Sequence, residues 1–291
     1  MLFKTLKYIW NHPYNRHNRL DAILRFFKWQ VGSRLNPYPV AYPYTEKTRL
    51  LVWNGLTGAT GNIYCGLLEY DDMCFLLHFL REEDLFIDAG ANVGAYTILA
   101  SGEVGSRTLS IEPVPRTFSY LSDNIHLNRL DERVSLFNIG LGSQAGKLKF
   151  TSSLDTVNHV ATRDEPGVID VEVRKMDELS DNIPALIKID VEGFETEVLR
   201  GAQKILANPI LKAIIIELNG SGARYGYDEN QIHADLLQLG FTAFGYDPAK
   251  RALLPRETFG NHNTIYVRDM PYVSKRLNES QSFKIGSNHR I

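Results

Sequence analysis

The chain has 291 residues, 44% of them hydrophobic and 23% charged, with a formal net charge of −2 and a pI near 6.5. This composition is ordinary for a globular protein, and the length accommodates one large α/β domain with additional segments. A charge this close to neutral argues against bulk attraction to nucleic acid. The two cysteines, Cys65 and Cys74, form no C-x-x-C motif, so we expect a reduced, cytoplasmic compartment.

Residues 1–60 are predicted to form an N-terminal extension that is basic, aromatic and partly helical, with a helix from near Arg16 to Arg34. The first 50 residues hold nine Lys and Arg against two acidic residues, a net charge of +7. In one interpretation, residues 1–35 contact another acidic partner or the anionic surface of a membrane at its inner face. In the other, they cover one end of the fold and their basic side chains extend to solvent. We favour the covering helix. Lys4 and Lys7 interrupt the N-terminal apolar run, so no targeting peptide is expected. No run in the chain approaches about 18 consecutive apolar residues, so no membrane span is expected.

The main domain is expected at residues 61–268. Residues 50–53 and 63–64 are predicted as strands, and residues 70–80 as an apolar helix. Five further strands, separated mostly by helices, predict a doubly wound, Rossmann-like parallel sheet; they are 85–88, 107–112, 134–139, 186–190 and 213–218. Residues 241–246 and 264–267 have no helix between them, which indicates an antiparallel pair at the sheet edge. The polar residues 269–291 are expected to be a mobile tail.

An insert separates the third and fourth of these strands. Residues 147–150 and 169–173 alternate as strands do, and the stretch between them, residues 151–167, is long and polar. Loops of more than about 12 residues in a compact domain are usually functional or disordered. Because it falls over the carboxyl edge of the sheet, we interpret this insert as a candidate substrate lid, with His159 as its only histidine.

The most informative stretch runs from Asp88 to Thr97 and joins a buried strand to a helix. Glycines at 90 and 94 allow the backbone to approach a ligand closely, and Asp88 ends the strand, where ligands bind in open α/β sheets. A dinucleotide site needs G-x-G-x-x-G, but Asn92 stands where its second glycine would be, and the acid would repel a phosphate. The spacing therefore disfavours a nicotinamide-dependent oxidoreductase and suits a cationic ligand.

Two later strand ends also carry acids. Glu112 and Pro113 follow the second strand, where a carboxylate about 20 residues after a nucleotide-binding turn can accept hydrogen bonds from ribose hydroxyls. Asp190 and Glu192 follow the strand that contains Lys188, beside the crevice defined by the first turn. Solvated carboxylates with a helix-capping role are the alternative interpretation of this second pair.

Taken together, the stretch from Asp88 to Gly94, the Glu112-Pro113 strand end and the block from Lys188 to Ala202 resemble the FkbM family of methyltransferases, over about residues 62–268. The resemblance implies S-adenosylmethionine as cofactor and a seven-stranded sheet with an antiparallel final strand. The stretch around Glu69 also resembles the stretch that precedes the first motif in that family. We assign cofactor binding to Glu69, Asp88, Gly90, Asn92, Gly94, Glu112, Pro113, Asn138 and Asp190.

An alcohol acceptor needs a general base or a metal. The candidate catalytic residues are Glu192, His159 and Asp190, with His262 as a further one, and Asp190 serves either the cofactor amine or the acceptor. Oxygen ligands at Asp190 and Glu192 suit Mg²⁺, although no spacing demands a metal. The resemblance favours O-methylation of a saccharide hydroxyl, or of a related small polyol or polyketide, as a small-molecule or glycan acceptor. The alternative function is an inactive cofactor-binding module that docks through its basic N-terminus.

Overall fold

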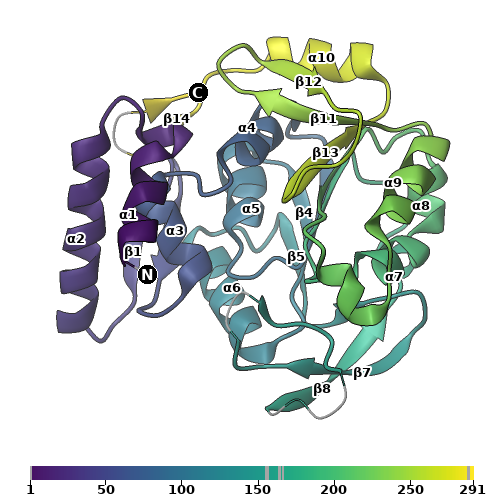
Figure 1. The fold of residues 1–291 in the computed structure, drawn as a ribbon, viewed down its shortest axis with the longest axis horizontal. Coiled ribbons are helices and arrows are strands. Elements are labelled where there is room, and N and C mark those ends of the chain that lie inside the picture. Colours follow the sequence, from purple (N-terminus) through teal and green to yellow (C-terminus); the bar gives the residue numbers. More distant parts are fainter. Residues whose placement is uncertain (1, 155–156, 163–164, 166, 287–288) are drawn as a thin grey trace.

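A mostly parallel sheet flanked by helices forms the centre of the molecule (Figure 1). The computed structural model describes residues 2–154, 157–162, 165, 167–286 and 289–291. The sheet has eight strands in the order β12-β11-β13-β10-β9-β3-β4-β5. Their bounds are β3 Leu85–Ala89, β4 Arg107–Ile111, β5 Val134–Phe137, β9 Leu186–Ile189, β10 Ala213–Glu217, β11 Thr242–Asp247, β12 Ala252–Pro255 and β13 Asn263–Val267.

The chain winds in two directions from β3. It runs outward through β4 and β5 and then returns to the other side of β3 for β9 and β10, all in parallel pairs. β13 pairs antiparallel with β11, as the sequence predicted, and it also pairs antiparallel with β10. The doubly wound, Rossmann-like fold is thereby confirmed, and its topological switch point lies between β3 and β9. The predicted strand number was one too few, because β12 extends the edge by pairing antiparallel with β11.

Helices cover both faces of the sheet because successive strand residues point to opposite sides. Phe86 packs in the cluster that includes α4 (Tyr70–Phe79) and the helical segment η2 (Ile98–Val104), which continues α5 (Ala95–Thr97). Ile87 packs in the cluster that includes α7 (Glu195–Arg200), α8 (Gln203–Ala207) and α9 (Glu229–Gln238). The predicted 70–80 helix is thus confirmed as α4. α6 (Pro115–Leu127) packs on the first turn through Leu121 and Ile125.

The insert forms a small sheet of its own. Its strands are β6 (Gly140–Leu141), β7 (Gly146–Thr151) and β8 (Val168–Arg174), in the order β6-β8-β7. Both strands predicted there are confirmed, and they pair antiparallel from Gly146 with Val173 to Thr151 with Val168. The connecting stretch is described only at 152–154, 157–162, 165 and 167.

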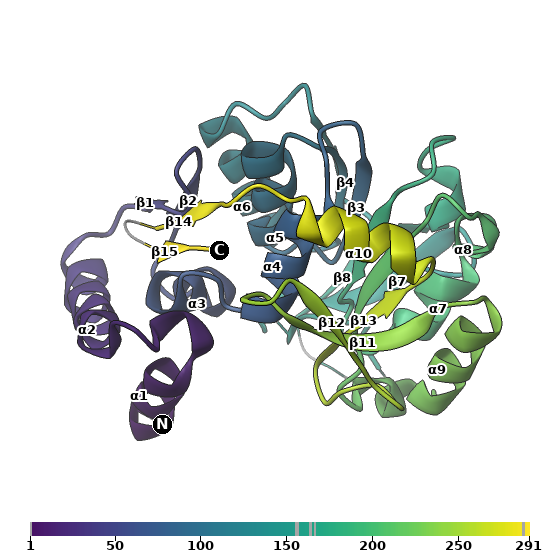
Figure 2. The ribbon, with the colours of Figure 1, turned by 90° about the horizontal axis from the view of Figure 1, so that it is seen from above.

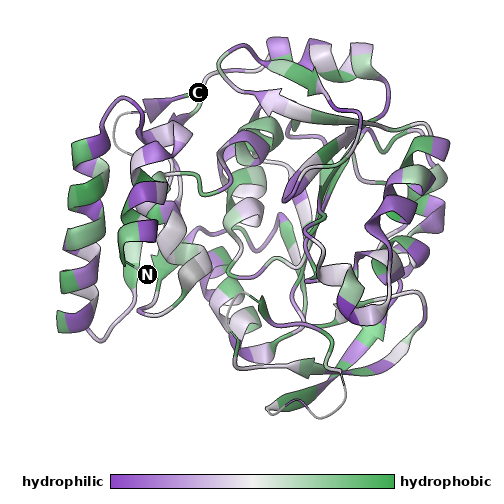
Figure 3. Ribbon diagram, viewed as in Figure 1, coloured by the Kyte–Doolittle hydropathy of each residue, from purple (hydrophilic) through white to green (hydrophobic). Residues whose placement is uncertain are grey.

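The N-terminal extension lies at one end of the molecule in both ribbon views (Figure 1, Figure 2). It contains α1 (Leu2–Asn11), the short helix η1 (Pro13–Asn15), α2 (Arg19–Leu35), β1 (Val40–Pro43) and β2 (Arg49–Val52). α2 and β2 confirm the predicted helix and the first predicted strand. Hydrophobic and hydrophilic segments alternate along α2 (Figure 3).

The predicted strand at Ile63 and Tyr64 was wrong, because both residues lie in α3 (Thr57–Cys65). Their strand propensity is overridden by packing: both are buried, and the Arg25 side chain donates hydrogen bonds to their carbonyls at 3.1 and 3.0 Å. The domain boundary expected at residue 60 therefore falls inside a helix. One hydrophobic core joins the extension to the main sheet.

The C-terminal residues expected to be a mobile tail instead contain α10 (Met270–Asn278), β14 (Lys284–Ile285) and β15 (His289–Arg290). Only two buried apolar residues, Val273 and Leu277, mark the inner face of α10, too few to register as a periodic pattern. Arg276 fixes this helix through an ion pair with Asp84 at 2.8 Å. Among the described helices, none is long and apolar enough to cross a bilayer.

Candidate active site

A cavity of about 310 Å³ opens at the carboxyl ends of β3, β4, β9 and β10. This is the position where open α/β sheets bind ligands. Two groups of residues lie at this opening, and all of them except Gly94 line the cavity. We call Asp88, Gly90, Asn92, Gly94 and Glu112, on and beside the first turn, the donor half. We call Asp190, Glu192 and Glu217, at the ends of β9 and β10, the acceptor half.

The first turn is held by two glycines with positive φ. Gly90 has φ +83°, and a Cβ there would lie 1.8 Å from the backbone oxygen of Asp190. Gly94 has φ +88°, and its Cβ would lie 2.6 Å from Leu121 Cδ1. Gly90 must therefore be glycine because the loop after β9 crosses directly over it, while Gly94 lets α6 pack on the turn.

Asn92 shapes the same turn with its side chain. Its φ is +51°, a conformation that asparagine adopts more readily than most residues, and its Oδ1 accepts a 2.8 Å hydrogen bond from the Val93 N–H. The Asn92 N–H donates to Glu112 Oε2 at 3.1 Å. The asparagine therefore fastens the turn to the end of β4.

Glu112 is buried and fixed from two directions. Besides Asn92, the Val114 N–H donates to its Oε1 at 2.9 Å. Burial raises the pKa of Glu112 to about 7, against the lowering effect of these backbone donors. Pro113 lines the cavity next to it. Asn138, by contrast, is exposed and supports the strand end from outside, donating to the carbonyls of Glu112 and Pro113 at 2.9 and 3.1 Å.

Asp88 is 1% exposed and lies at the floor of the cavity. Its Oδ2 accepts a 2.7 Å hydrogen bond from the Thr97 hydroxyl, whereas its Oδ1 is buried and has no hydrogen-bond partner among the described residues. Burial raises the pKa of Asp88, and the charge of Lys188 opposes that rise. An unpaired buried oxygen is costly unless a ligand satisfies it, so Asp88 is suited to a cationic or hydrogen-donating ligand.

Lys188 supplies the positive charge beneath the acceptor half. Its ammonium is buried, 2.8 Å from Asp190 Oδ2 and 4.9 Å from the centroid of the Tyr96 ring. Burial lowers its pKa, but the carboxylates of Asp190, Glu69 and Asp88 outweigh burial and hold the pKa above its usual value. Lys188 is therefore an ammonium ion that neutralises part of the acidic cavity.

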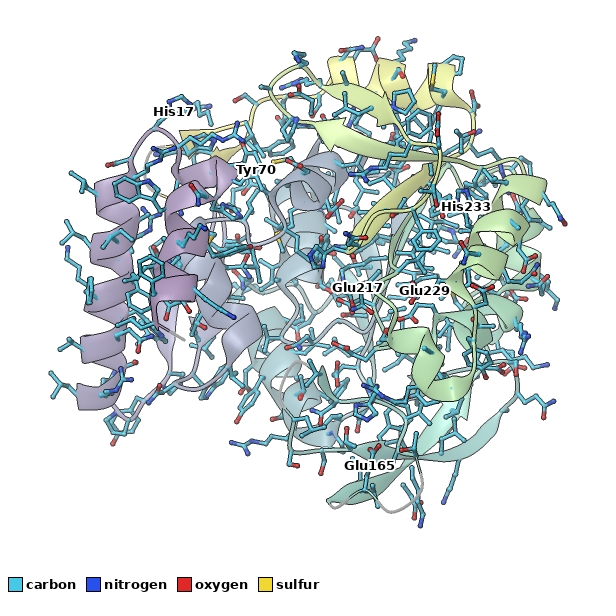
Figure 4. All side chains as sticks on the ribbon, in the orientation of Figure 1. His17, Tyr70, Glu165, Glu217, Glu229 and His233 are labelled. Atoms are coloured by element: carbon cyan, nitrogen blue, oxygen red, sulfur yellow. The ribbon has the colours of Figure 1, made fainter. Side chains whose placement is uncertain are left out.

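The three acids of the acceptor half converge. One carboxylate oxygen from each of Asp190, Glu192 and Glu217 lies within 4.8 Å of the others. Burial, and then the Asp190 charge, raise the pKa of Glu192 to about 7 and that of Glu217 to about 8. Figure 4 shows Glu217 near the centre of the molecule. A carboxylate whose pKa lies near neutrality is matched to a general base.

The family follows from a comparison with known proteins. A model described as the methyltransferase FkbM domain matches residues 88–247, more than half of the chain. The chain belongs to the FkbM methyltransferase family. The match spans all five residues of the donor half and all three of the acceptor half.

Three known methyltransferases show what this chain is similar to. The hexuronic acid methyltransferase AglP of Haloferax volcanii is 29% identical over 155 residues, which are 52% of this chain and 62% of that protein. Methyltransferase sdnD of Sordaria araneosa is 28% identical over 209 residues, covering 59% of this chain and 79% of its own length. A solved FkbM methyltransferase from Methylobacillus flagellatus shares 17% identity and a TM-score of 0.46, covering 71% of this chain and 52% of that one. This chain thus spans about three fifths of the Haloferax relative's length.

Of the other predicted site residues, Glu69 lines the cavity, whereas His159 and His262 do not. Glu69 lines the cavity just before α4, and its Oε1 accepts a 2.9 Å hydrogen bond from Asn263 Nδ2. His159 does not line the cavity: its ring nitrogens lie 2.8 Å from the Val157 carbonyl and 3.1 Å from Glu165 Oε2. Figure 4 shows Glu165 on the insert, well apart from Glu217. His262 is exposed and also lies outside the cavity lining.

The insert still reaches the cavity through other residues. Phe150 and Asn158 form part of its wall, and the Tyr225 hydroxyl donates to the Val160 carbonyl at 2.7 Å. The stretch predicted as a lid is therefore placed beside the cavity where it is described. Residues 155–156, 163–164 and 166 lie outside the described part of the chain.

Glu217 is the site residue that the sequence reasoning missed. It is the last residue of β10, next to the strand that ends before Asp190. The signal was available, because the strand-end logic that singled out Glu112 and Asp190 applies equally to it. The oxygen donors of the acceptor half suit a hard divalent cation such as Mg²⁺, but Lys188 already pairs with one of them.

Proposed function

We propose that this chain transfers a methyl group from S-adenosylmethionine to a hydroxyl group of a saccharide. The observation that carries the proposal is that the donor and acceptor halves face one cavity. One half has glycines that admit a ligand to the backbone and a buried acid, and the other has carboxylates of raised pKa. A donor and an acceptor bound there are held next to each other, and positioning supplies a large part of the rate of such a transfer.

The donor half fits the cofactor chemically. S-adenosylmethionine, when bound, supplies an electrophilic methyl group on a sulfonium, and it carries an amine but no phosphate. Glu112 accepts hydrogen bonds from the ribose hydroxyls, because each of its oxygens has a lone pair beyond its backbone bond. The backbone at Gly90 approaches the ligand without a side chain in between. Asp88 Oδ1, Glu69 and Asp190 provide the negative field that suits a cation.

The acceptor half supplies the base. With S-adenosylmethionine bound, Glu192 would accept the proton that the sugar hydroxyl loses when the sugar oxygen takes up the methyl group. Glu192 is held for this role by a loop in which Glu195 accepts from the N–H groups of Val191 and Gly193 at 3.2 and 3.1 Å. Glu217 lies beside it as a second acceptor for the same proton, and the Lys188 ammonium pairs with Asp190.

A saccharide acceptor is supported by the Haloferax relative, whose name specifies a hexuronic acid. The chain itself adds a charge argument. The clustered acids of the acceptor half repel a substrate carboxylate, so we expect a neutral sugar hydroxyl to react more readily here than one beside a uronate group.

The experiment is a methylation assay with labelled S-adenosylmethionine on a panel of neutral hexosides, hexuronates and small polyols. The proposal predicts label on a sugar, with neutral hexosides ahead of hexuronates. Label transfer in none of the classes, combined with measurable cofactor binding, would instead support the inactive cofactor-binding module.

A further inference from the structure

Helix α2 carries two apolar faces, and the described structure uses only one of them. Ala22, Phe26, Trp29 and Ser33 are buried against the fold. A second stripe recurs every three or four residues on the opposite side and is between 47% and 81% exposed; we call Leu20, Leu24, Phe27, Val31 and Leu35 the outer stripe. A helix that only covers one end of a fold needs a single apolar face.

Helix α1 enlarges the same end of the molecule. It contacts α2, and both helices lie farthest from the sheet in Figure 1 and Figure 2. Phe3 and Trp10 are exposed on it, 80% and 40%, and the Arg19 guanidinium lies 5.3 Å from the Trp10 ring centroid. The pair of helices therefore presents an extended apolar surface, whereas an ordinary monomer exposes apolar residues singly.

The charges around this surface have one sign. Six bases on or beside the two helices are exposed: Lys4, Lys7, Arg16, Arg19, Lys28 and Arg34. Asp21 is the one acidic residue before residue 46, and it is paired with Arg25. Lys28 and Arg34 follow Leu24 and Val31 by four and three residues, so they flank the outer stripe on the helix surface.

We propose that the outer faces of α1 and α2 dock on an anionic lipid bilayer. The outer stripe enters the boundary between headgroups and acyl chains, and the flanking bases contact anionic headgroups. A second copy of the chain fits less well, because pairing two such faces would bring like charges together. The inference is independent of the proposed function and adds a surface on which the enzyme works.

The test is co-sedimentation of the full chain with phosphatidylcholine vesicles, with or without phosphatidylglycerol. A stripe variant carries Leu24→Gln, Phe27→Gln and Val31→Gln, and a charge variant carries Lys28→Gln and Arg34→Gln. The matched control carries Ile210→Gln, Leu237→Gln and Leu254→Gln, three apolar residues of similar exposure outside α1 and α2. Because every substituted side chain is exposed, circular dichroism should show unchanged folding.

We expect the native chain and the control to bind anionic vesicles alike, with weaker binding at high salt, and the stripe variant to lose about tenfold or more in affinity. The charge variant should lose affinity for anionic vesicles only. Equal binding to neutral vesicles, equal binding by the stripe variant, or no vesicle binding together with a dimer that the stripe variant dissociates would each overturn the proposal.

Discussion

The two halves of the cavity are built in different ways. In the donor half, the backbone determines the geometry: Gly90 lies under the Asp190 carbonyl, and Glu112 is held by two backbone N–H groups. In the acceptor half, three partly exposed carboxylates converge from two strand ends, with an insert forming part of the wall. The donor half is thus fixed by backbone contacts and local in sequence, whereas the acceptor half depends on side chains brought together by the sheet.

The largest expected effect is on the donor half, from Gly90→Ala. The new Cβ would overlap the Asp190 carbonyl, so the loop after β9 must move, and we expect a loss of more than about 3 kcal/mol of unfolding free energy together with loss of cofactor binding. Urea unfolding measures the first effect and calorimetry the second.

Gly240→Ala is the matched control for this substitution. Its φ of +85° is close to that of Gly90, but its Cβ would meet nothing within 4 Å. It should cost only the backbone strain of about 1–2 kcal/mol and leave cofactor binding intact. Equal destabilisation by the two substitutions would mean that close approach at Gly90 is not what fixes the turn.

Removing the insert loop should affect the acceptor half and leave the donor half unchanged. Replacing residues 152–166 by one asparagine leaves a two-residue Asn-Gly turn, with Gly167, between the paired residues Thr151 and Val168. We predict that turnover is abolished, because Asn158 leaves the cavity wall, while cofactor affinity stays within a few fold. An equal loss of affinity and turnover would make the insert a structural element of both halves.

Glu192→Gln tests the base within the acceptor half. We expect kcat to fall by about 10²–10⁴, the usual contribution of general base catalysis, with cofactor affinity nearly unchanged. In the native enzyme, activity should rise with pH through about 7, because Glu192 must be ionised to accept a proton. The variant should lack this rise; a pH profile that keeps the same rising limb would assign the base elsewhere.

The raised pKa of Glu192 also affects the stability of the fold. The pKa of Glu192 is raised on folding from 4.5 to about 7, so its ionisation is harder in the folded state. The contribution of Glu192 to the free energy of unfolding is therefore fully present below pH 4.5, and it is lost as the pH rises through about 7. Glu192→Gln should make the free energy of unfolding less dependent on pH in this window.

The different construction of the donor and acceptor halves also explains which site residues could be predicted from the sequence. The donor half was predictable because a turn, its glycines and the next strand end lie within 25 residues of one another, from Asp88 to Glu112. Glu217 also ends a strand, but it lies outside the three motif blocks that carry the family resemblance, so it was missed. His159 was chosen as the only histidine of an insert expected over the carboxyl edge of the sheet, and the structure places its ring against Val157 and Glu165 instead. In the same way, α10 is held by the distant pair of Arg276 with Asp84, which no local pattern reveals.

The most direct test of the account is a calorimetric titration of S-adenosylmethionine into the native chain and into folded variants of each half. We predict binding by the native chain, a loss of about a hundredfold or more in Asp88→Ala and Glu112→Ala, and affinity within a few fold of native in Glu192→Gln. Glu172→Ala, an exposed glutamate on β8, is the control and should bind as the native chain does. Undiminished binding in both Asp88→Ala and Glu112→Ala would contradict the assignment of the donor half.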